Sequence, residues 1–360
     1  MKDITFRSYK IGDEKAIVEL FEKVFKKPMG CTDSLQHWKW EFESNSVKPI
    51  SVCLAWDGER LVGQYAVNPI RVWVSGKQLL MALSLDTMTD PDYSRKGIFK
   101  KAALQLYQQL VEQGVSFVFG FPNINSIHGF KRKLDWKIIA VPPVYLCPIT
   151  FLQPSQKTSL NLLKNLCFKT HKLILKKRLS RTEKNHLHLI IRKDVLFDSW
   201  ADELWQKCCT QHDVWAVRDS AYLRWRYNER PETSYEYYTA WHEGKIAGYV
   251  VTIDKIREEG PIKFVLDIMV DLKIKGVADA LIAAVLRSSY EKRIALVSTI
   301  IMPGSHYKMT FLKNYFIPLP RMLFPQEIYF GAKSLTENPL MPDVLKQKSW
   351  HLCWGDTDLL

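Results

Sequence analysis

The sequence from residue 89 to residue 110 places cations at the start of a helix, where acidic residues are usual. A turn with two aspartates leads into the motif S-R-K-G (residues 94–97), and an amphipathic pattern follows. Because free backbone N–H groups already make a helix start positive, Arg95 and Lys96 add like charge there. An anion in the turn would compensate, and Gly97 would let the backbone approach it closely. We predict a pyrophosphate-binding turn, with a plain helix start as the alternative.

The strand before this turn carries one acidic residue, Asp86, among mostly apolar neighbours. Alternation along the strand predicts two faces, formed by Ser84, Asp86 and Met88 on one side and by Leu83, Leu85 and Thr87 on the other. Burial on such a strand would raise the pKa of Asp86, which suits a general base. The alternative is a structural role, in which Asp86 orders a turn or binds a neighbouring backbone N–H.

Hydrophobic patterning predicts the elements that position these residues. An antiparallel meander becomes parallel through one strand–helix–strand crossover, which gives an α/β (α+β) fold with a mixed, mostly antiparallel sheet flanked by helices. The expected helices span 13–25, 97–113 and 125–133, and the expected strands span 50–57, 60–76, 79–89 and 115–122, followed by a pair of strands after Trp136.

The second half of the chain repeats features of the first in the same order. The recurring pairs are "SLQHWKW" and "SAYLRWRY", "AWDGERLVG" and "AWHEGKIAG", Asp86 and Asp267, and Gly97 and Gly276. We therefore predict a duplicated domain. The expected parts are a cofactor-binding domain (1–150), a basic helical linker (151–194) and a degenerate second domain (195–360).

The composition is that of a soluble protein, with 47% apolar and 25% charged residues among 360. The N-terminus lacks the apolar core of a signal peptide, and prolines interrupt the charge-free run 138–156, which favours strands over a membrane span. Seven scattered cysteines without a C-x-x-C pair indicate reduced thiols in a cytoplasm. No metal is expected, and His186 and His188 are interpreted as part of a strand edge.

The net charge of +13 is concentrated in residues 157–193, which hold eleven Lys or Arg and a single acid. Leucines recur there at nearly helical spacing. This pattern is compatible with a helix on an anionic membrane surface, a helix binding RNA phosphates, or an ordinary helix with a solvated basic face. We place membrane contact ahead of nucleic acid, because no RNA-binding motif accompanies the segment.

The turn and its flanking segments resemble the acetyl-CoA core of the GNAT N-acetyltransferase superfamily. "TDP" (residues 89–91) matches the end of the family's V-x-P strand, and "SRKGIF" (residues 94–99) matches its R/Q-x-x-G-x-G/A loop, with serine and phenylalanine at the outer positions. The segment from Asn123 matches the later N…A/S…Y pattern, with Phe130 in place of the usual tyrosine. The acetyl-CoA contacts that the resemblance implies are Thr87, Met88, Thr89, Ser94, Arg95, Lys96, Gly97, Ile98, Phe99, Asn123, Ser126 and Phe130.

The resemblance also implies a direct acyl transfer, in which Asp86 removes the proton of an amine and a backbone N–H of its strand stabilises the oxyanion. We expect an acyl-CoA-dependent N-acyltransferase, with acetyl as the acyl group and an amino sugar of a surface polysaccharide as a candidate acceptor. A cytoplasmic monomer or dimer is expected. Aminoacyl-tRNA-dependent transfer and non-catalytic acyl-CoA binding are the alternatives.

The C-terminal tail offers a second source of a catalytic carboxylate. In related multi-domain acetyltransferases the chain's own terminus reaches the active site, so Asp356, Asp358 or the carboxylate of Leu360 are candidates. We favour a final strand that closes the second sheet with its acids exposed.

Overall fold

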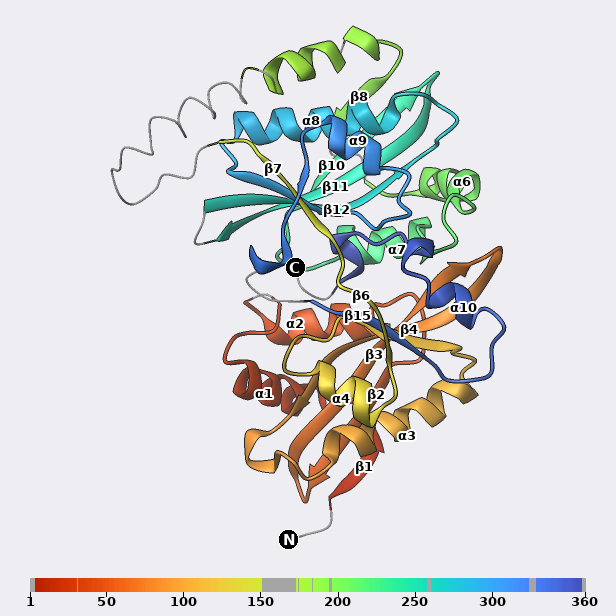
Figure 1. Cartoon of the computed structure of the whole chain (residues 1–360). Coiled ribbons are helices and arrows are strands. Elements are labelled where there is room, and N and C mark those ends of the chain that lie inside the picture. The colour runs from red at the N-terminus through yellow and green to blue at the C-terminus, as the bar shows by residue number, and fades with distance from the viewer. Residues whose placement is uncertain are drawn as a thin grey trace. The chain divides into compact units, whose positions relative to one another are not determined.

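The computed structural model describes residues 4–30, 32–150, 173, 175–182, 184–193, 196–257, 260–323 and 328–357. The chain divides into two compact units, each built around one mixed sheet (Figure 1). Unit 1 comprises Met1–Val141, His212–Thr233 and Pro325–Trp350, and unit 2 comprises Pro142–Gln211, Ser234–Phe324 and His351–Leu360. Each unit thus includes segments from both halves of the sequence. The fold is of the predicted α/β class, whereas the domain boundaries at residues 150 and 194 stay a prediction.

The sheet of unit 1 follows the order β1-β2-β3-β4-β5-β15-β6, with β9 paired to β3. The strands are β1 (Thr5–Ser8), β2 (Ser51–Asp57), β3 (Arg60–Val74), β4 (Lys77–Thr89), β5 (Phe117–Gly120), β6 (Lys137–Ala140), β9 (Val214–Ala216) and β15 (Phe330–Ser334). β1 to β4 form the predicted antiparallel meander, and β5 runs parallel to β4. The predicted crossover is therefore confirmed.

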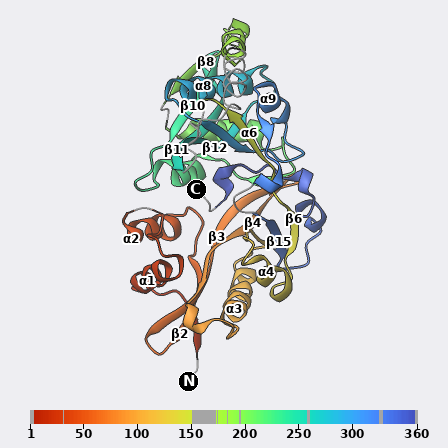
Figure 2. The ribbon, with the colours of Figure 1, turned by 60° about the vertical axis from the view of Figure 1, so that its left-hand side comes forward.

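Helices cover both faces of this sheet. They are α1 (Glu14–Phe25), α2 (Ser34–Trp38) with a π-helical extension η1 (Lys39–Glu43), α3 (Ile98–Glu112), α4 (Ile127–Lys133), α7 (Ser220–Leu223) with a π-helical extension η3 (Arg224–Asn228), and α10 (Met341–Val344), besides the 3-10 turns η2 (Pro91–Tyr93) and η5 (Gln347–Ser349). α1 and α2 lie on one face, and α3 and α4 lie on the other (Figure 2). The apolar side of α3, including Ala102, Leu106 and Leu110, is buried, as an amphipathic pattern requires.

The sheet of unit 2 follows the order β14-β7-β13-β12-β11-β10-β8. Its strands are β7 (Val144–Pro148), β8 (Ile190–Lys193), β10 (Glu236–His242), β11 (Lys245–Arg257), β12 (Gly260–Val270), β13 (Leu296–Ile300) and β14 (Ile317–Pro318), and its helices and 3-10 turns are α6 (Ser199–Cys208), α8 (Val277–Glu291), α9 (Lys308–Lys313), η4 (Arg321–Leu323) and η6 (Trp354–Asp356). Adjacent residues of β11 face opposite helices: the ring of Tyr249 contacts Trp200 of α6, whereas Val250 packs in the core that contains Leu281 of α8. α6 and α8 therefore cover opposite faces.

One glycine has the same packing role in each unit. A β-carbon on Gly63 would lie 2.4 Å from the side chain of Ile98, the first residue of α3. A β-carbon on Gly248 would lie 2.9 Å from Val277, the first residue of α8. In both units the absent side chain lets the start of the crossover helix pack directly on the sheet.

Three local expectations need correction. The two strands after Trp136 do not pair with each other, because β6 pairs with β15 and β7 pairs with β13 and β14. His186 and His188 lie in a turn before β8, so they are not part of a strand. The described part of the tail, up to residue 357, forms the 3-10 turn η6 and no strand, and Asp356 is buried and accepts a hydrogen bond from the backbone N–H of Cys353.

Some of the predictions concern residues that lie outside the described part of the chain. These include most of the predicted linker, with residues 151–172, and the tail positions Asp358 and Leu360. In the part of the chain that the structure describes, no helix is long and apolar enough to cross a membrane.

Candidate functional site in unit 1

The backbone of β4 changes its pairing where the candidate residues begin. Its parallel pairing with β5 runs from Met81 to Ser84, opposite residues 117–120, and goes no further. β4 itself continues to Thr89. Among the described residues, no strand pairs with this edge of β4 from Leu85 onward, so its N–H and C=O groups are open to another hydrogen-bonding partner.

A β-bulge lies in the same part of β4. Leu85 pairs with Ala66 and Met88 pairs with Gln64, so two residues of β4 stand opposite one residue of β3. Asp86 takes a positive φ of 44°, and its carbonyl accepts a hydrogen bond from the Gln64 side chain at 3.0 Å. A bulge of this kind redirects side chains, because it interrupts the alternation of the strand.

The bulge turns Asp86 away from Ser84. The Ser84 hydroxyl lies 3.1 Å from the hydroxyl of Tyr65, which in turn contacts Tyr107 of α3 at 2.8 Å. Asp86 instead interacts with Glu41 of η1, which directly continues α2 on the face of the sheet opposite α3. The prediction that Ser84 and Asp86 share one face is therefore wrong, and the reason is the extra residue in β4.

The environment of Asp86 strongly favours its protonated form. Burial raises the pKa of Asp86 well above its usual range, and repulsion by Glu41 together with a hydrogen bond to it raises the pKa further, while Lys27 opposes the shift. The residue as a whole keeps some exposed surface, but its Oδ2 atom is shielded from solvent. Two carboxyl groups this close share a proton more readily than they both ionise.

His37 extends the pair into a chain of three titratable groups. Its Nε2 lies 3.8 Å from Oε2 of Glu41, one helical turn along the same segment. Burial lowers the pKa of His37 to about 3, and the charges of Arg230 and Arg226 lower it further. Because His37 is neutral at physiological pH, it does not compensate the charge of Glu41.

The helices that carry Glu41 and His37 are held by a symmetric contact inside unit 1. The indole N–H of Trp40 donates to the carbonyl of Trp225 at 2.7 Å, and the indole N–H of Trp225 donates to the carbonyl of Trp40 at 2.9 Å. The two rings stack with centroids 5.6 Å apart. This contact joins the two aromatic segments, "SLQHWKW" and "SAYLRWRY", that the sequence analysis matched as an internal repeat.

The predicted anion turn lies at the other end of the open stretch of β4. Residues 94–97 are exposed, and Gly97 has a left-handed φ of 77° and forms the N-cap of α3 without a side-chain hydrogen bond. The first backbone N–H groups of α3 have no acceptor within the helix. A β-carbon on Gly97 would meet no atom within 4 Å, so the turn is unobstructed.

Ion pairs fix the turn in place. Asp90 is buried at 1% exposure, and its carboxylate pairs with Lys23 at 2.8 Å and with Arg60 at 2.6 Å. Lys96 stands over the ring of Tyr93 at 4.1 Å. Asp90 thus neutralises Lys23 and Arg60, which flank the turn. Arg95 is exposed, and its backbone has a positive φ of 64°.

The later predicted residues have structural contacts. Asn123 Oδ1 accepts hydrogen bonds from the backbone N–H groups of Asn125 and Ser126, which starts α4. Phe130 is buried against Phe99 and Trp136, with ring centroids 5.3 and 4.6 Å away. The structure therefore brings Thr87, Met88 and Thr89 together with Asp86 along the open part of β4, and it places Phe130 in the core.

Sequence reasoning missed Glu41 and His37. The sequence did contain one indication that these two residues act together. They are four residues apart in the segment "HWKWE", which puts both on one face of a helix. Nothing in the local sequence indicated that this face would meet Asp86, which lies 45 residues further along the chain.

Unit 2 has a similar pair of parallel strands and a similar glycine turn before a helix. In this unit, side chains of the same unit fill the space beside both features. β12 and β13 pair only as far as Phe264 and Ser298. At that point Trp354 of the C-terminal segment packs on Phe264 and donates its indole N–H to Ser298 at 3.2 Å. At the turn before α8, the ring of His186 fills the space beside Gly276, where a β-carbon would come within 2.1 Å of it.

Comparisons with known proteins agree with this fold. Residues 5–139 match the family model described as an acetyltransferase (GNAT) domain. A comparison with curated protein sequences found no significant match. The structure is similar to a GCN5-related N-acetyltransferase from Anabaena variabilis ATCC 29413, with a TM-score of 0.66 and 14% identity over 93% of this chain and 73% of that chain.

Two further solved structures have the same overall fold. One is a protein of unknown function, a probable N-acyltransferase, from Enterococcus faecalis V583, with a TM-score of 0.65 and 12% identity over 93% of this chain and 73% of that chain. The other is Saccharomyces cerevisiae N-myristoyltransferase with bound myristoyl-CoA, with a TM-score of 0.59 and 11% identity over 92% of this chain and 83% of that chain. The chain therefore has a GNAT-like fold, and its residues 5–139 match the GNAT domain model by sequence as well.

Proposed function

We propose that this protein is an acyl-CoA-dependent N-acyltransferase whose working site lies in unit 1, with acetyl as the acyl group and a primary amine as the acceptor. The observation that carries the proposal is the open stretch of β4 from Leu85 to Thr89. It begins at the shielded carboxyl group of Asp86 and leads to the exposed turn 94–97. An acyl-CoA carries a thioester at one end and a pyrophosphate further along. The thioester would lie near Asp86, and the pyrophosphate would lie at the turn 94–97.

In the proposed reaction, the amine nitrogen attacks the thioester carbon and the C–S bond breaks. Asp86 takes the proton that the amine loses, and the coenzyme A thiolate leaves and takes a proton from water. Backbone N–H groups along the bulged strand stabilise the oxyanion, since they have fixed directions in a partly dry site. The raised pKa of Asp86 makes its carboxylate a stronger base than an exposed aspartate.

We propose further that only unit 1 binds the donor. His186 beside Gly276 and Trp354 at the divergence of β12 and β13 take up, in unit 2, the positions that remain open in unit 1. An amino sugar of a surface polysaccharide is a narrower proposal for the acceptor, which rests on the basic composition of residues 157–193.

Calorimetry with acetyl-CoA tests this proposal. Wild-type protein should bind one donor per chain, and Gly97→Glu should abolish binding by adding negative charge to the turn. The matched control is Gly114→Glu, since Gly114 is also exposed at the other end of α3, with a φ of 79° and no atom within 4 Å of a β-carbon. It should bind normally.

Absence of binding by the wild-type protein would overturn the proposal. In that case co-purified nucleic acid, detected as a high ratio of absorbance at 260 to 280 nm, would favour the aminoacyl-tRNA alternative. Binding without turnover on any amine would instead support a non-catalytic acyl-CoA-binding protein.

A further inference from the structure

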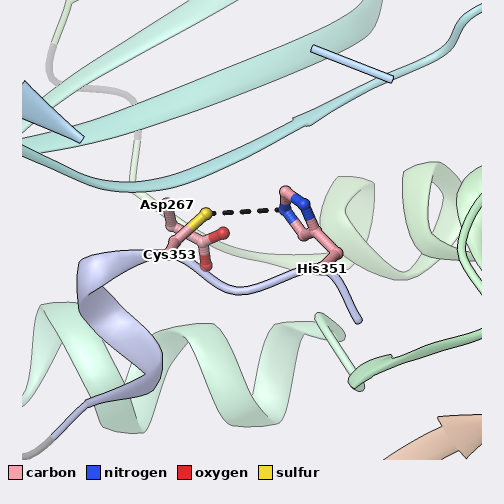
Figure 3. Close-up of side chains that lie close together, drawn as sticks. All are labelled: Asp267, His351 and Cys353. Atoms are coloured by element: carbon pink, nitrogen blue, oxygen red, sulfur yellow. Dashed lines mark hydrogen bonds between the residues drawn. The ribbon is translucent and has the colours of Figure 1, made fainter. Parts of the chain in front are cut away.

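A cluster of three possible metal ligands is buried in unit 2. Asp267 projects from β12, and His351 and Cys353 come from the C-terminal segment that runs beside it (Figure 3). The three residues are 0%, 3% and 1% exposed. None of them belongs to the candidate site in unit 1.

The spacing of the ligand atoms fits a single small cation. One ligand atom from each residue lies within 4.8 Å of the other two, and the Sγ of Cys353 is 3.4 Å from the Nε2 of His351. In a tetrahedral zinc site, bonds of about 2.3 Å to sulfur and about 2.0–2.1 Å to nitrogen put these two atoms roughly 3.5 Å apart. The observed separation agrees with that geometry.

The kinds of ligand narrow the choice of metal. A thiolate, an imidazole and a carboxylate together suit Zn²⁺ and its substitute Co²⁺, whereas Mg²⁺ and Ca²⁺ prefer oxygen alone. A divalent cation would also neutralise the carboxylate and the thiolate, both of which are costly to bury as anions. The backbone at Cys353 is extended, and side chains two residues apart along extended backbone point to the same side, so one segment can supply both His351 and Cys353.

We propose that Asp267, His351 and Cys353 bind a zinc ion that ties the C-terminal segment to β12. The Tyr307 ring packs on His351 with centroids 5.4 Å apart. The Tyr307 hydroxyl accepts a hydrogen bond from the backbone N–H of Val270 at 3.3 Å, and a water would complete a four-coordinate shell. The metal stabilises unit 2 by holding Trp354 where β12 and β13 diverge.

The sequence did not indicate this site because its ligands do not form a local motif. Asp267 precedes His351 by 84 residues, and His351-Leu-Cys353 alone is too short to be specific. Without a metal, the same contact would be a weak hydrogen bond between the Cys353 thiol and His351. The two interpretations differ in the metal content and the spectrum that they predict.

The test uses the full chain. Metal analysis of the purified protein should find one zinc per chain. After removal by a chelator, titration with Co²⁺ should give visible d–d bands of tetrahedral intensity and a thiolate-to-cobalt charge-transfer band in the near ultraviolet. Asp267→Asn, which is nearly isosteric, should weaken Co²⁺ binding by at least about tenfold, since loss of an outer-shell partner alone costs as much. Cys353→Ala should abolish the charge-transfer band.

Cys147→Ala is the matched control, because Cys147 is equally buried on β7 of the same unit. It should keep both the zinc and the cobalt spectrum. Failure of the wild-type protein to bind Co²⁺, or a charge-transfer band that survives in folded Cys353→Ala, would overturn the proposal. If Cys353→Ala does not fold, the wild-type spectrum and Asp267→Asn decide the question.

Discussion

At the scale of single residues, Asp86 and Glu41 form an interacting pair of carboxyl groups in unit 1. Burial, repulsion and a hydrogen bond within the pair all raise the pKa of Asp86. Neutral His37 beside Glu41 does not relieve the repulsion. Such a pair is unfavourable for folding when both groups are ionised, and strained electrostatics of this kind are found at functional sites.

Glu41→Gln should shift the pH dependence of acyl transfer to lower pH. A general base must be deprotonated, so activity falls as the pH drops through the pKa of Asp86. Removal of the Glu41 charge lowers that pKa, because the repulsion disappears. The acid limb of kcat/KM against pH would reveal the shift, with Glu19→Gln as a control on the adjacent helix α1. An unshifted limb would mean that Asp86 does not titrate in catalysis.

Asp86→Asn should lower kcat/KM by about 10²-fold or more, the usual contribution of a general base, and should stabilise the protein at pH 8. A raised pKa favours folding at low pH, and this advantage is lost as the pH rises through the pKa of the folded state. The amide carries no buried charge, so each unit of pKa shift is worth about 1.4 kcal/mol to the variant at high pH.

Thermal unfolding of Asp86→Asn at pH 8 and at pH 4.5 checks the stability effect, which should be much smaller at the lower pH. Asp13→Asn is a control of opposite sign. The hydrogen bonds from Arg7 lower the pKa of Asp13, so its replacement should destabilise the protein at pH 8. A loss of stability in Asp86→Asn at pH 8 would favour a structural role for Asp86.

At the scale of elements, the pairing of two α-helix–π-helix segments positions Glu41. α2 with η1 and α7 with η3 have the same order of α- and π-helical turns, and each begins with an aspartate cap, Asp33 or Asp219. Their tryptophans exchange hydrogen bonds from side chain to backbone. The carboxylate pair therefore depends on a contact between segments 185 residues apart in sequence.

Trp40→Phe and Trp225→Phe should each destabilise the protein by about 1–3 kcal/mol, because each leaves a buried carbonyl without its donor. Urea unfolding measures the change. Trp73→Phe, on the half-buried end of β3, should cost less than about 1 kcal/mol. Equal effects of all three changes would show that ring volume matters and that the reciprocal hydrogen bonds do not.

At the scale of the whole molecule, each of the two units contains segments from both halves of the sequence. β15 from the C-terminal part is inserted between β5 and β6 of unit 1, and β9 pairs with β3. β7, from the N-terminal half, pairs with β13 in unit 2. Neither sheet is completed by a continuous stretch of sequence.

A fragment of residues 1–150 should therefore fail to fold cooperatively, although it contains the whole predicted first domain. Without β15, the facing edges of β5 and β6 lose their backbone partners, and an exposed edge promotes aggregation. Circular dichroism and urea unfolding of the fragment are the measurements. A sharp unfolding transition would contradict this expectation and would support a boundary near residue 150.

The local elements of unit 1 could be predicted from the sequence. The helices 13–25 and 97–113 and the meander strands agree with the structure within a few residues, because periodicity and turn residues act over short distances. Gly97 also stands at the start of α3 as expected. The face of Asp86 was predicted wrongly, since a bulge depends on the pairing of two strands and leaves no clear sign in either one alone.

The sequence by itself determined the α/β class, the crossover after β4, and the exposed turn that carries Arg95, Lys96 and Gly97. The tertiary structure decided that Asp86 meets Glu41, that β6 and β7 enter different sheets, and that His351 and Cys353 lie beside Asp267. The physical reason is the range of the forces involved. Backbone propensity and hydrophobic periodicity act between neighbours, whereas these contacts depend on how separated segments share a sheet or a buried core.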